Sequence, residues 1–203
     1  VWWKYLGEKK PWKRRKPWSN WNFFKHKLLI TTFTKNTTNA TKYNSLNGNF
    51  VYRTIFPPRH STKIYCELYI DHRPLTDFPD YAISLEELGN SAIKPGHFYI
   101  LTCECGEPSC RELHTPFIVK HYNEYISWHI QDPGPERILN FQIDAYRQAV
   151  YKLLKTTNQI LSVYARKIES QDWQLIPFFS EWNPKKLRSF EKQVARLLHR
   201  PGK

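Results

Sequence analysis

The sequence predicts an α+β fold with a mainly antiparallel sheet, a long helix and a C-terminal amphipathic helix. Two observations predict it: segments with β-strand patterns dominate from about residue 50 to residue 143, and segments with helical periodicity dominate from residue 144 to the end. Because the helices follow the strands and do not alternate with them one for one, a parallel α/β sheet is disfavoured. The 203 residues, of which 40% are hydrophobic, suffice for one core of ordinary size.

Composition and charge divide the chain into three predicted parts. Residues 1–49 form a basic, Trp-rich arm and a Thr/Asn-rich linker, residues 50–183 an α+β domain with a Cys/His knuckle, and residues 184–203 a basic amphipathic helix. The formal net charge of +13 gathers at the ends, because residues 1–60 hold 13 Lys/Arg against one acid, whereas residues 61–183 hold 11 against 16. Basic ends around a mildly acidic middle suggest appendages that meet polyanions.

Two strands are expected at the start of the domain, at 50–56 and at 63–71. The second segment alternates, and its apolar face carries Ile64, Cys66, Leu68 and Ile70. Cys66 is therefore expected to be a buried core residue and not a metal ligand. Asp71-His72-Arg73 is expected to form a turn, and no partner makes it catalytic.

A capping box predicts a short helix from about residue 85, because Ser84 is followed three positions later by Glu87. Residues 97–103, HFYILTC, are apolar on both faces. That pattern is typical of a central strand buried on both sides, so we expect one continuous strand there.

A hairpin is expected from residues 115–122 and 124–130, with residues 137–143 as a further short strand. His121 and His129 could face each other across this hairpin, and cross-strand packing is the expected reason for both. The hairpin supports the antiparallel part of the prediction.

Two helices are expected to complete the domain. Asp144 caps a long helix to about Ile168, which the stretch Thr156-Thr157-Asn158 kinks or ends. Residues 173–182 are aromatic and expected to pack on the domain. Pro184 begins the last helix, which carries an apolar stripe opposite a basic side made of Lys185, Arg188, Lys192 and Arg196. The stripe favours docking on the rest of the protein over insertion into a membrane.

A cluster of cysteines is the main candidate site. Cys103, Cys105, Cys110 and His114 have the spacing C-x-C-x4-C-x3-H, with Gly106 and Pro108 supplying the turn. Four sulfur and nitrogen ligands in a tetrahedron are what structural zinc requires. The leading interpretation is therefore a structural zinc knuckle with these four residues as metal ligands.

Three other interpretations of the cluster stay open. The thiols could be unliganded at a strand end. They could be redox-active, with Cys103 and Cys105 joined in a disulfide or one of them a reactive thiolate. They could hold a catalytic zinc with three protein ligands, a bound water, and Glu104 or Glu107 as the base.

Several stretches resemble a widespread, uncharacterised family of small bacterial proteins: ELYIDHRPL, SLEEL, FYILTCECGEPSC, a following His, YISWHI and AYRQAV. The family pattern is a strand that runs into T-C-x-C-G-x-P-x-C, followed by a hairpin that ends in W-x-I or W-x-V. The resemblance covers roughly residues 63–155 and leaves the arm outside. Arg111-Glu112 stand where the family has a small pair such as Ala-Gly. The resemblance implies no activity, since none is established for the family.

The arm interleaves cations with indoles, as in KKPWKRRKPW. Cations neutralise phosphates and indoles stack on exposed bases, which suits nucleic acid. An anionic membrane surface, docking of the indoles on the domain, and a merely solvated segment are the alternatives. The candidate nucleic-acid-binding residues are Trp12, Lys13, Arg14, Arg15, Lys16, Trp18 and Trp21.

The leading functional hypothesis is a non-enzymatic binding protein, with a structural zinc knuckle and basic ends that contact nucleic acid or another polyanion. The alternatives are a protein-interaction adaptor in bacterial regulation or defence, whose partner is a protein, and a zinc-dependent hydrolase. We expect a cytoplasmic protein, because we find no transmembrane segment and no secretion signal and because four cysteines are too few for a disulfide scaffold.

Overall fold

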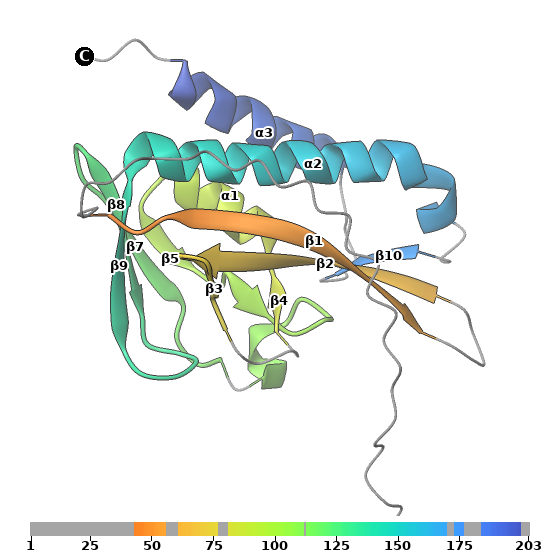
Figure 1. Cartoon of the computed structure of the whole chain (residues 1–203), viewed down its shortest axis with the longest axis horizontal. Helices are drawn as coiled ribbons and strands as arrows, with labels where there is room; N and C mark the ends of the chain where they lie inside the picture. Colours follow the sequence, from red (N-terminus) through yellow and green to blue (C-terminus); the bar gives the residue numbers. More distant parts are fainter. Residues whose placement is uncertain are drawn as a thin grey trace, which may run out of the picture.

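The computed structural model describes residues 43–55, 61–76, 81–111, 113–169, 173–176 and 184–199. The fold is α+β, as predicted, and Figure 1 shows its helices gathered on one side of the strands. The helices are α1 (Leu85–Ile93), α2 (Ile143–Glu169) and α3 (Pro184–Leu198), and a short 3-10 turn, η1, spans Pro108–Arg111.

The first sheet has the strand order β1-β2-β10, with β3 paired to β2. Its strands are β1 (Leu46–Ile55), β2 (Ser61–Ile70), β3 (Arg73–Pro74) and β10 (Trp173–Ile176). β1 and β3 run antiparallel to β2, whereas β10 runs parallel to it. β1 begins four residues earlier than the strand expected at 50–56, and Leu46 is already buried.

A second sheet contains the predicted hairpin, in the order β5-β7-β8-β9. Its strands are β5 (Gly96–Phe98), β7 (Phe117–His121), β8 (Tyr125–Ile130) and β9 (Arg137–Gln142). All its pairings are antiparallel. Ile126, Trp128 and Ile130 share the buried face of β8, so the predicted alternation is confirmed.

The single strand expected at 97–103 is wrong. The segment forms β5 and a separate strand, β6 (Leu101–Thr102), which pairs with β4 (Ala82–Ile83). Between β5 and β6 the backbone forms hydrogen bonds with residues at the start of α1. The Tyr99 N–H donates to the Glu87 carboxylate, and the Ile100 carbonyl accepts from the Ser84 N–H. The segment is largely apolar because Phe98, Ile100 and Leu101 are buried, not because one strand continues.

The Ser84 cap is confirmed, because its hydroxyl accepts from the Glu87 N–H at 3.3 Å. The long helix differs from the prediction in two details. Its first turn is capped by the Gln142 side chain, which accepts from the Ala145 N–H, and not by Asp144. It also runs straight through Thr157, whose hydroxyl donates to the Leu153 carbonyl, and loses helical geometry only at Tyr164.

The core lies between α2 and the sheets. Trp128 is fully buried at its centre and contacts the rings of Phe117, Phe141 and Tyr146. α2 lies along β1, with α3 on its other side (Figure 1). At Gly48 in β1, an added Cβ would come within 2.7 Å of the Leu153 side chain. The absence of a side chain there therefore lets α2 approach the sheet.

His121 and His129 do not face each other, which corrects the expectation for the hairpin. In the β7–β8 register His121 lies opposite Ile126, and His129 lies opposite Ile118. The two histidines are therefore at opposite ends of the hairpin. His121 bonds to the Ser91 carbonyl, and His129 pairs with Glu136.

Candidate cysteine site

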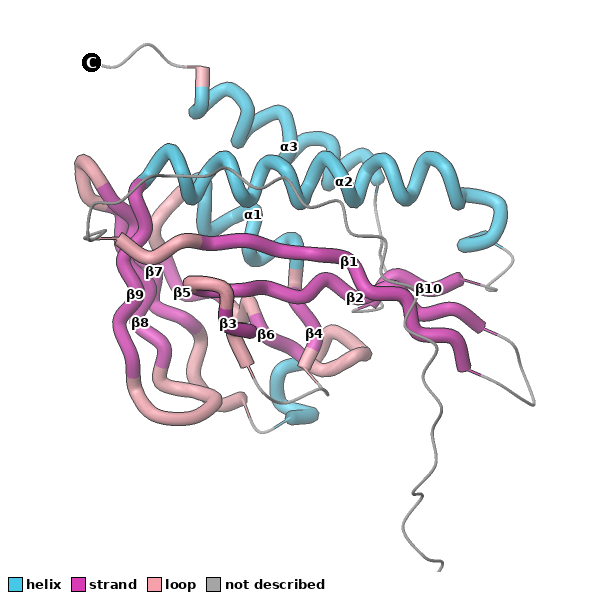
Figure 2. Tube along the Cα trace, in the orientation of Figure 1, coloured by secondary structure: helices cyan, strands magenta, loops and turns pink. Residues whose placement is uncertain are grey.

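Cys103 and Cys105 lie in a tight turn that links β6 to η1, and Cys110 lies in η1 itself, near the lower edge of the described part of the molecule in Figure 2. Two backbone hydrogen bonds close the turn, from the Gly106 N–H to the Cys103 carbonyl at 3.0 Å and from the Cys103 N–H to the Glu107 carbonyl at 3.5 Å. Gly106 has φ +89°, a left-handed conformation that glycine adopts without strain. Backbone geometry therefore folds the chain back so that Cys110 returns to the first two cysteines.

Three sulfur atoms meet in this turn. The Sγ atoms of Cys103, Cys105 and Cys110 all lie within 4.8 Å of one another, and those of Cys105 and Cys110 are 3.6 Å apart. Two thiolates bound about 2.3 Å from one tetrahedral zinc ion would be about 3.8 Å apart. These three cysteines could therefore hold a metal ion.

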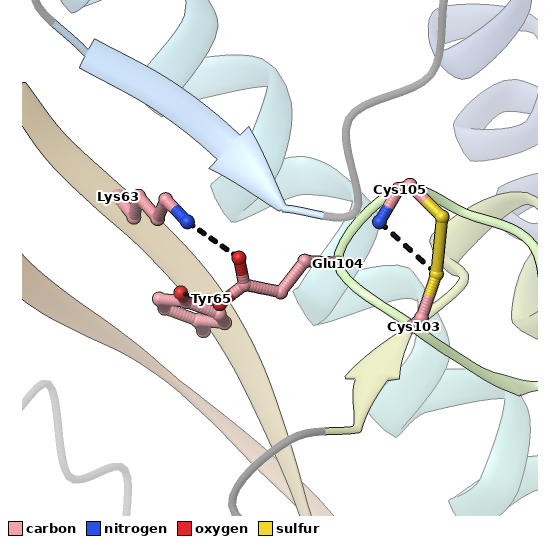
Figure 3. Close-up of polar contacts among 5 residues, drawn as sticks. All are labelled: Lys63, Tyr65, Cys103, Glu104 and Cys105. Carbon is pink, nitrogen blue, oxygen red and sulfur yellow. Dashed lines mark hydrogen bonds and ion pairs between the residues drawn. A yellow bond between two sulfur atoms is a disulfide. The ribbon is translucent and has the colours of Figure 1, made fainter. Parts of the chain in front are cut away.

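Cys103 and Cys105 are joined by a disulfide in the structure (Figure 3). Cys110 is a free, exposed thiol. The Cys105 N–H also donates to the Cys103 Sγ at 3.2 Å. In this oxidised state only Cys110 can supply a thiolate. Metal binding by all three sulfurs consequently requires the disulfide to be reduced first.

His114 lies outside the group of candidate ligands found among the described residues. Its side chain is exposed, the neighbouring Leu113 is buried, and its own carbonyl accepts from the Tyr99 hydroxyl at 3.5 Å. Of the four ligands predicted from the sequence, the structure thus brings the three cysteines together and leaves the histidine apart from them.

Glu104 ties the cysteine turn to the first sheet. Its carboxylate forms an ion pair with Lys63 and accepts a hydrogen bond from the Tyr65 hydroxyl, and both residues are in β2. Figure 3 shows the Glu104 side chain pointing toward β2, away from the disulfide on its other side. Glu107, the other carboxylate considered as a base, is exposed and accepts from the Ser109 hydroxyl.

Lys63 and Tyr65 were missed at the sequence level. Their spacing of two on a strand places both side chains on one face, and that signal was available. What the sequence did not indicate is that Glu104, about forty positions later, comes to lie opposite that face. Only the path of β6 beside β4 and β2 creates this contact.

Cys66 is buried in the core with 3% of its surface exposed, as predicted. Burial raises the pKa of its thiol far above the ordinary value, and the nearby Glu67 carboxylate raises it further. Because the thiolate is the reactive and metal-binding form, Cys66 is chemically inert in the folded protein.

The candidate nucleic-acid-binding residues of the arm, Trp12 to Trp21, lie outside the described residues. The last helix is described, and it separates its two sides. Leu187 and Val194 are buried against the other helices. The basic side of α3 is exposed and consists of Lys185, Arg188, Lys192 and Arg196.

Comparison of the chain with protein-family models, with curated proteins and with solved structures finds no match. Each helix within the described ranges is too short or too polar to span a lipid bilayer.

Proposed function

We propose that this chain is a non-enzymatic binding protein, in which the reduced cysteine turn holds a structural zinc ion and the basic ends contact nucleic acid or another polyanion. The observation that carries the metal part is the convergence of Cys103, Cys105 and Cys110, in which the Cys105 and Cys110 sulfurs are 3.6 Å apart, close to the spacing of two zinc thiolates. Zinc bound there would fasten the end of β6 to η1.

The surroundings of Glu104 favour a structural ion over a catalytic one. A general base must be free to take a proton from a metal-bound water. The Glu104 carboxylate instead accepts from Tyr65 and pairs with Lys63. We therefore assign Glu104 to holding the turn in place, where it supports the ligands on either side of it in the sequence.

A zinc titration of the reduced protein tests the metal part. The protein is treated with a phosphine reductant, freed of metal with a chelator, and titrated with zinc against a chromophoric competitor. We expect one zinc per chain in the wild type and in Cys66→Ala, whose thiol is buried away from the turn. In Cys105→Ser and Cys110→Ser we expect zinc affinity to fall by about a hundredfold or more, because each loses one thiolate ligand. Equal affinity in all four proteins would contradict the proposal.

The exposed basic side of α3 supports the polyanion part, together with the 13 Lys/Arg of residues 1–60. Each phosphate that a cation neutralises releases counterions. The logarithm of the binding constant therefore falls linearly with the logarithm of the salt concentration. If the protein bound through hydrophobic contacts instead, its affinity would depend little on the salt concentration.

Fluorescence anisotropy with a single-stranded oligonucleotide, measured over a range of salt concentrations, tests this part. We expect binding by the full chain with a steep salt slope. Deletion of residues 1–30 should weaken it and flatten the slope. Arg188→Glu combined with Lys192→Glu should do the same to a smaller degree, because the arm holds more cations. Absence of binding at low salt would remove nucleic acid from the function and leave a protein partner. Binding unchanged by both alterations would remove the basic ends from the interaction.

A further inference from the structure

We infer that the cysteine turn is also a thiol–disulfide exchange site, in which Cys110 opens the Cys103–Cys105 disulfide and low-molecular-weight thiols and disulfides are the substrates. This inference does not rest on the zinc proposal. It uses the same sulfurs in their oxidised state, in which the turn cannot bind zinc through all three.

The distance between the attacking and attacked sulfur atoms carries the inference. The free Cys110 Sγ lies 3.6 Å from the Cys105 Sγ, which is one half of the disulfide. That separation is near van der Waals contact for the two sulfurs. A thiolate formed at Cys110 is therefore already in contact with a disulfide sulfur.

The structure also provides for the leaving group. When the disulfide opens by attack on Cys105, the electron pair departs on Cys103. The Cys105 N–H already donates to that sulfur at 3.2 Å, and a hydrogen bond to a thiolate stabilises its charge. Although Cys103 is only 5% exposed, this donor makes it a better leaving group than an unassisted buried sulfur.

Exposure determines which sulfurs an outside molecule can reach. Cys105 and Cys110 are exposed, whereas Cys103 is buried. Internal exchange thus moves the disulfide from a half-buried pair to a fully exposed pair. By replacing Cys103 in the disulfide, Cys110 gives a bond that external thiols can reach at both sulfurs.

The internal exchange needs no other molecule, and the reduction that follows it uses only the external thiol. The Cys110 thiolate attacks the Cys105 Sγ, a Cys105–Cys110 bond forms, the Cys103–Cys105 bond breaks, and Cys103 becomes a thiolate. An external thiol such as glutathione then attacks the Cys110 Sγ, which gives a mixed disulfide and releases the Cys105 thiolate. A second glutathione attacks the mixed disulfide and releases glutathione disulfide. The protein ends as three thiols, and two glutathione molecules have been oxidised.

Glu104 makes the first step directly observable, because it separates Cys103 from Cys105 in the sequence. The oxidised protein is incubated with a chelator, quenched in acid, alkylated, and cleaved after Glu104. A Cys103–Cys105 disulfide keeps the two peptides joined, whereas a Cys105–Cys110 disulfide lets them separate. We expect both forms in the wild type and only the joined form in Cys110→Ser.

The rate of reduction by glutathione gives the second readout. We expect Cys110→Ser to be reduced about tenfold more slowly than the wild type, because glutathione must then attack the disulfide without the internal step. Cys66→Ala is the matched control and should react like the wild type. Cys103→Ser retains Cys105 and Cys110, the two exposed cysteines. When glutathione disulfide is added as the oxidant, this variant should form a Cys105–Cys110 disulfide.

Equal reduction rates for wild type and Cys110→Ser, with no separated peptides, would overturn the inference. Failure of Cys103→Ser to form its disulfide, while its far-ultraviolet circular dichroism matches the wild type, would also overturn it. Because zinc is chelated throughout, neither result depends on whether the reduced protein binds metal.

Discussion

Glu104 links the cysteine turn to the first sheet. It sits between two of the three sulfur-bearing residues, and its carboxylate is held by Lys63 and Tyr65 of β2. Residues that orient metal ligands from outside the coordination sphere commonly change affinity by 10–100-fold when replaced. The sequence around the cysteines shows the ligands, but the tether becomes visible only when the sheet is folded.

Glu104→Gln should weaken zinc binding by about tenfold in the reduced protein, because the amide loses the ion pair with Lys63. The measurement is the same competitive titration used for the cysteine variants. Glu107→Gln is the matched control, since its side chain is exposed and accepts a hydrogen bond from the nearby Ser109 hydroxyl. Equal losses in both variants would show that charge near the turn matters and the tether does not.

The pKa of Asp71 leads to a prediction about how the free energy of unfolding depends on pH. Partial burial raises the pKa of its carboxyl, but hydrogen bonds from Ser45 and Asn44, and the nearby His72, lower it more, so the net pKa lies below the ordinary value. A group with a depressed folded-state pKa stabilises the fold above its unfolded pKa of about 3.9, and this stabilisation is lost as the pH falls through the folded value.

Asp71→Asn should therefore have a lower free energy of unfolding than the wild type at pH 7, and the difference should shrink below about pH 4. Urea unfolding at several pH values measures it. A deficit that stays constant down to pH 2 would mean that the carboxylate charge is not what stabilises this turn.

Local sequence signals predicted several elements correctly. Strand alternation placed Ile64, Leu68 and Ile70 on the buried face of β2, and the Ser84 cap began α1. These features depend on neighbours within a few residues, so the sequence contains them. The split at 97–103 depends instead on two tertiary contacts with the start of α1. The Tyr99 N–H donates to the Glu87 carboxylate, and the Ile100 carbonyl accepts from the Ser84 N–H.

The same distinction explains the cysteine site. The spacing of Cys103, Cys105 and Cys110 implied that a short turn could gather them, and the backbone does so. His114 follows η1 and is separated from the sulfurs by the buried Leu113. The buried Leu113 anchors the chain after η1 in the core, so the position of His114 depends on tertiary packing as well as on its distance along the sequence.

The β2–β3 hairpin carries a prediction about backbone conformation. Ile70 pairs with Arg73, so Asp71 and His72 form a two-residue loop, and both have positive φ, 48° and 66°. A loop of this kind favours Asp-Gly, because glycine adopts the left-handed region without strain.

His72→Gly should raise the free energy of unfolding by about 0.5–1 kcal/mol, because it relieves the left-handed conformation of a residue with a Cβ. His97→Gly is the opposed control. It places glycine in an exposed position of β5 and should destabilise by about 0.5–1 kcal/mol. Thermal and urea unfolding measure both. Loss of stability in His72→Gly would contradict the turn geometry.

At the scale of the whole molecule, α3 contributes to both the core and the surface. Its apolar side packs on α1 and α2, with Leu187 and Val194 buried. Gly89 of α1 faces Phe190, and an added Cβ there would lie 3.6 Å from its side chain. The helix is thus part of the fold and at the same time presents its basic side to solvent.

Leu187→Ala should lower the free energy of unfolding by about 2–3 kcal/mol, since it leaves a cavity between α3 and the other helices. Lys192→Ala, on the exposed side, should change it by less than about 0.5 kcal/mol. Urea unfolding followed by tryptophan fluorescence distinguishes them. Little effect from Leu187→Ala would mean that α3 is not packed against the domain.

The central claim is that Cys103, Cys105 and Cys110 share one zinc ion when the disulfide is reduced. Zinc K-edge X-ray absorption of the reduced, zinc-loaded protein tests it most directly, because it counts the sulfur neighbours of the ion. We predict three sulfur atoms at about 2.3 Å from the zinc ion in the wild type and two in Cys110→Ser. A zinc ion surrounded only by oxygen and nitrogen, with the same spectrum in both proteins, would contradict it.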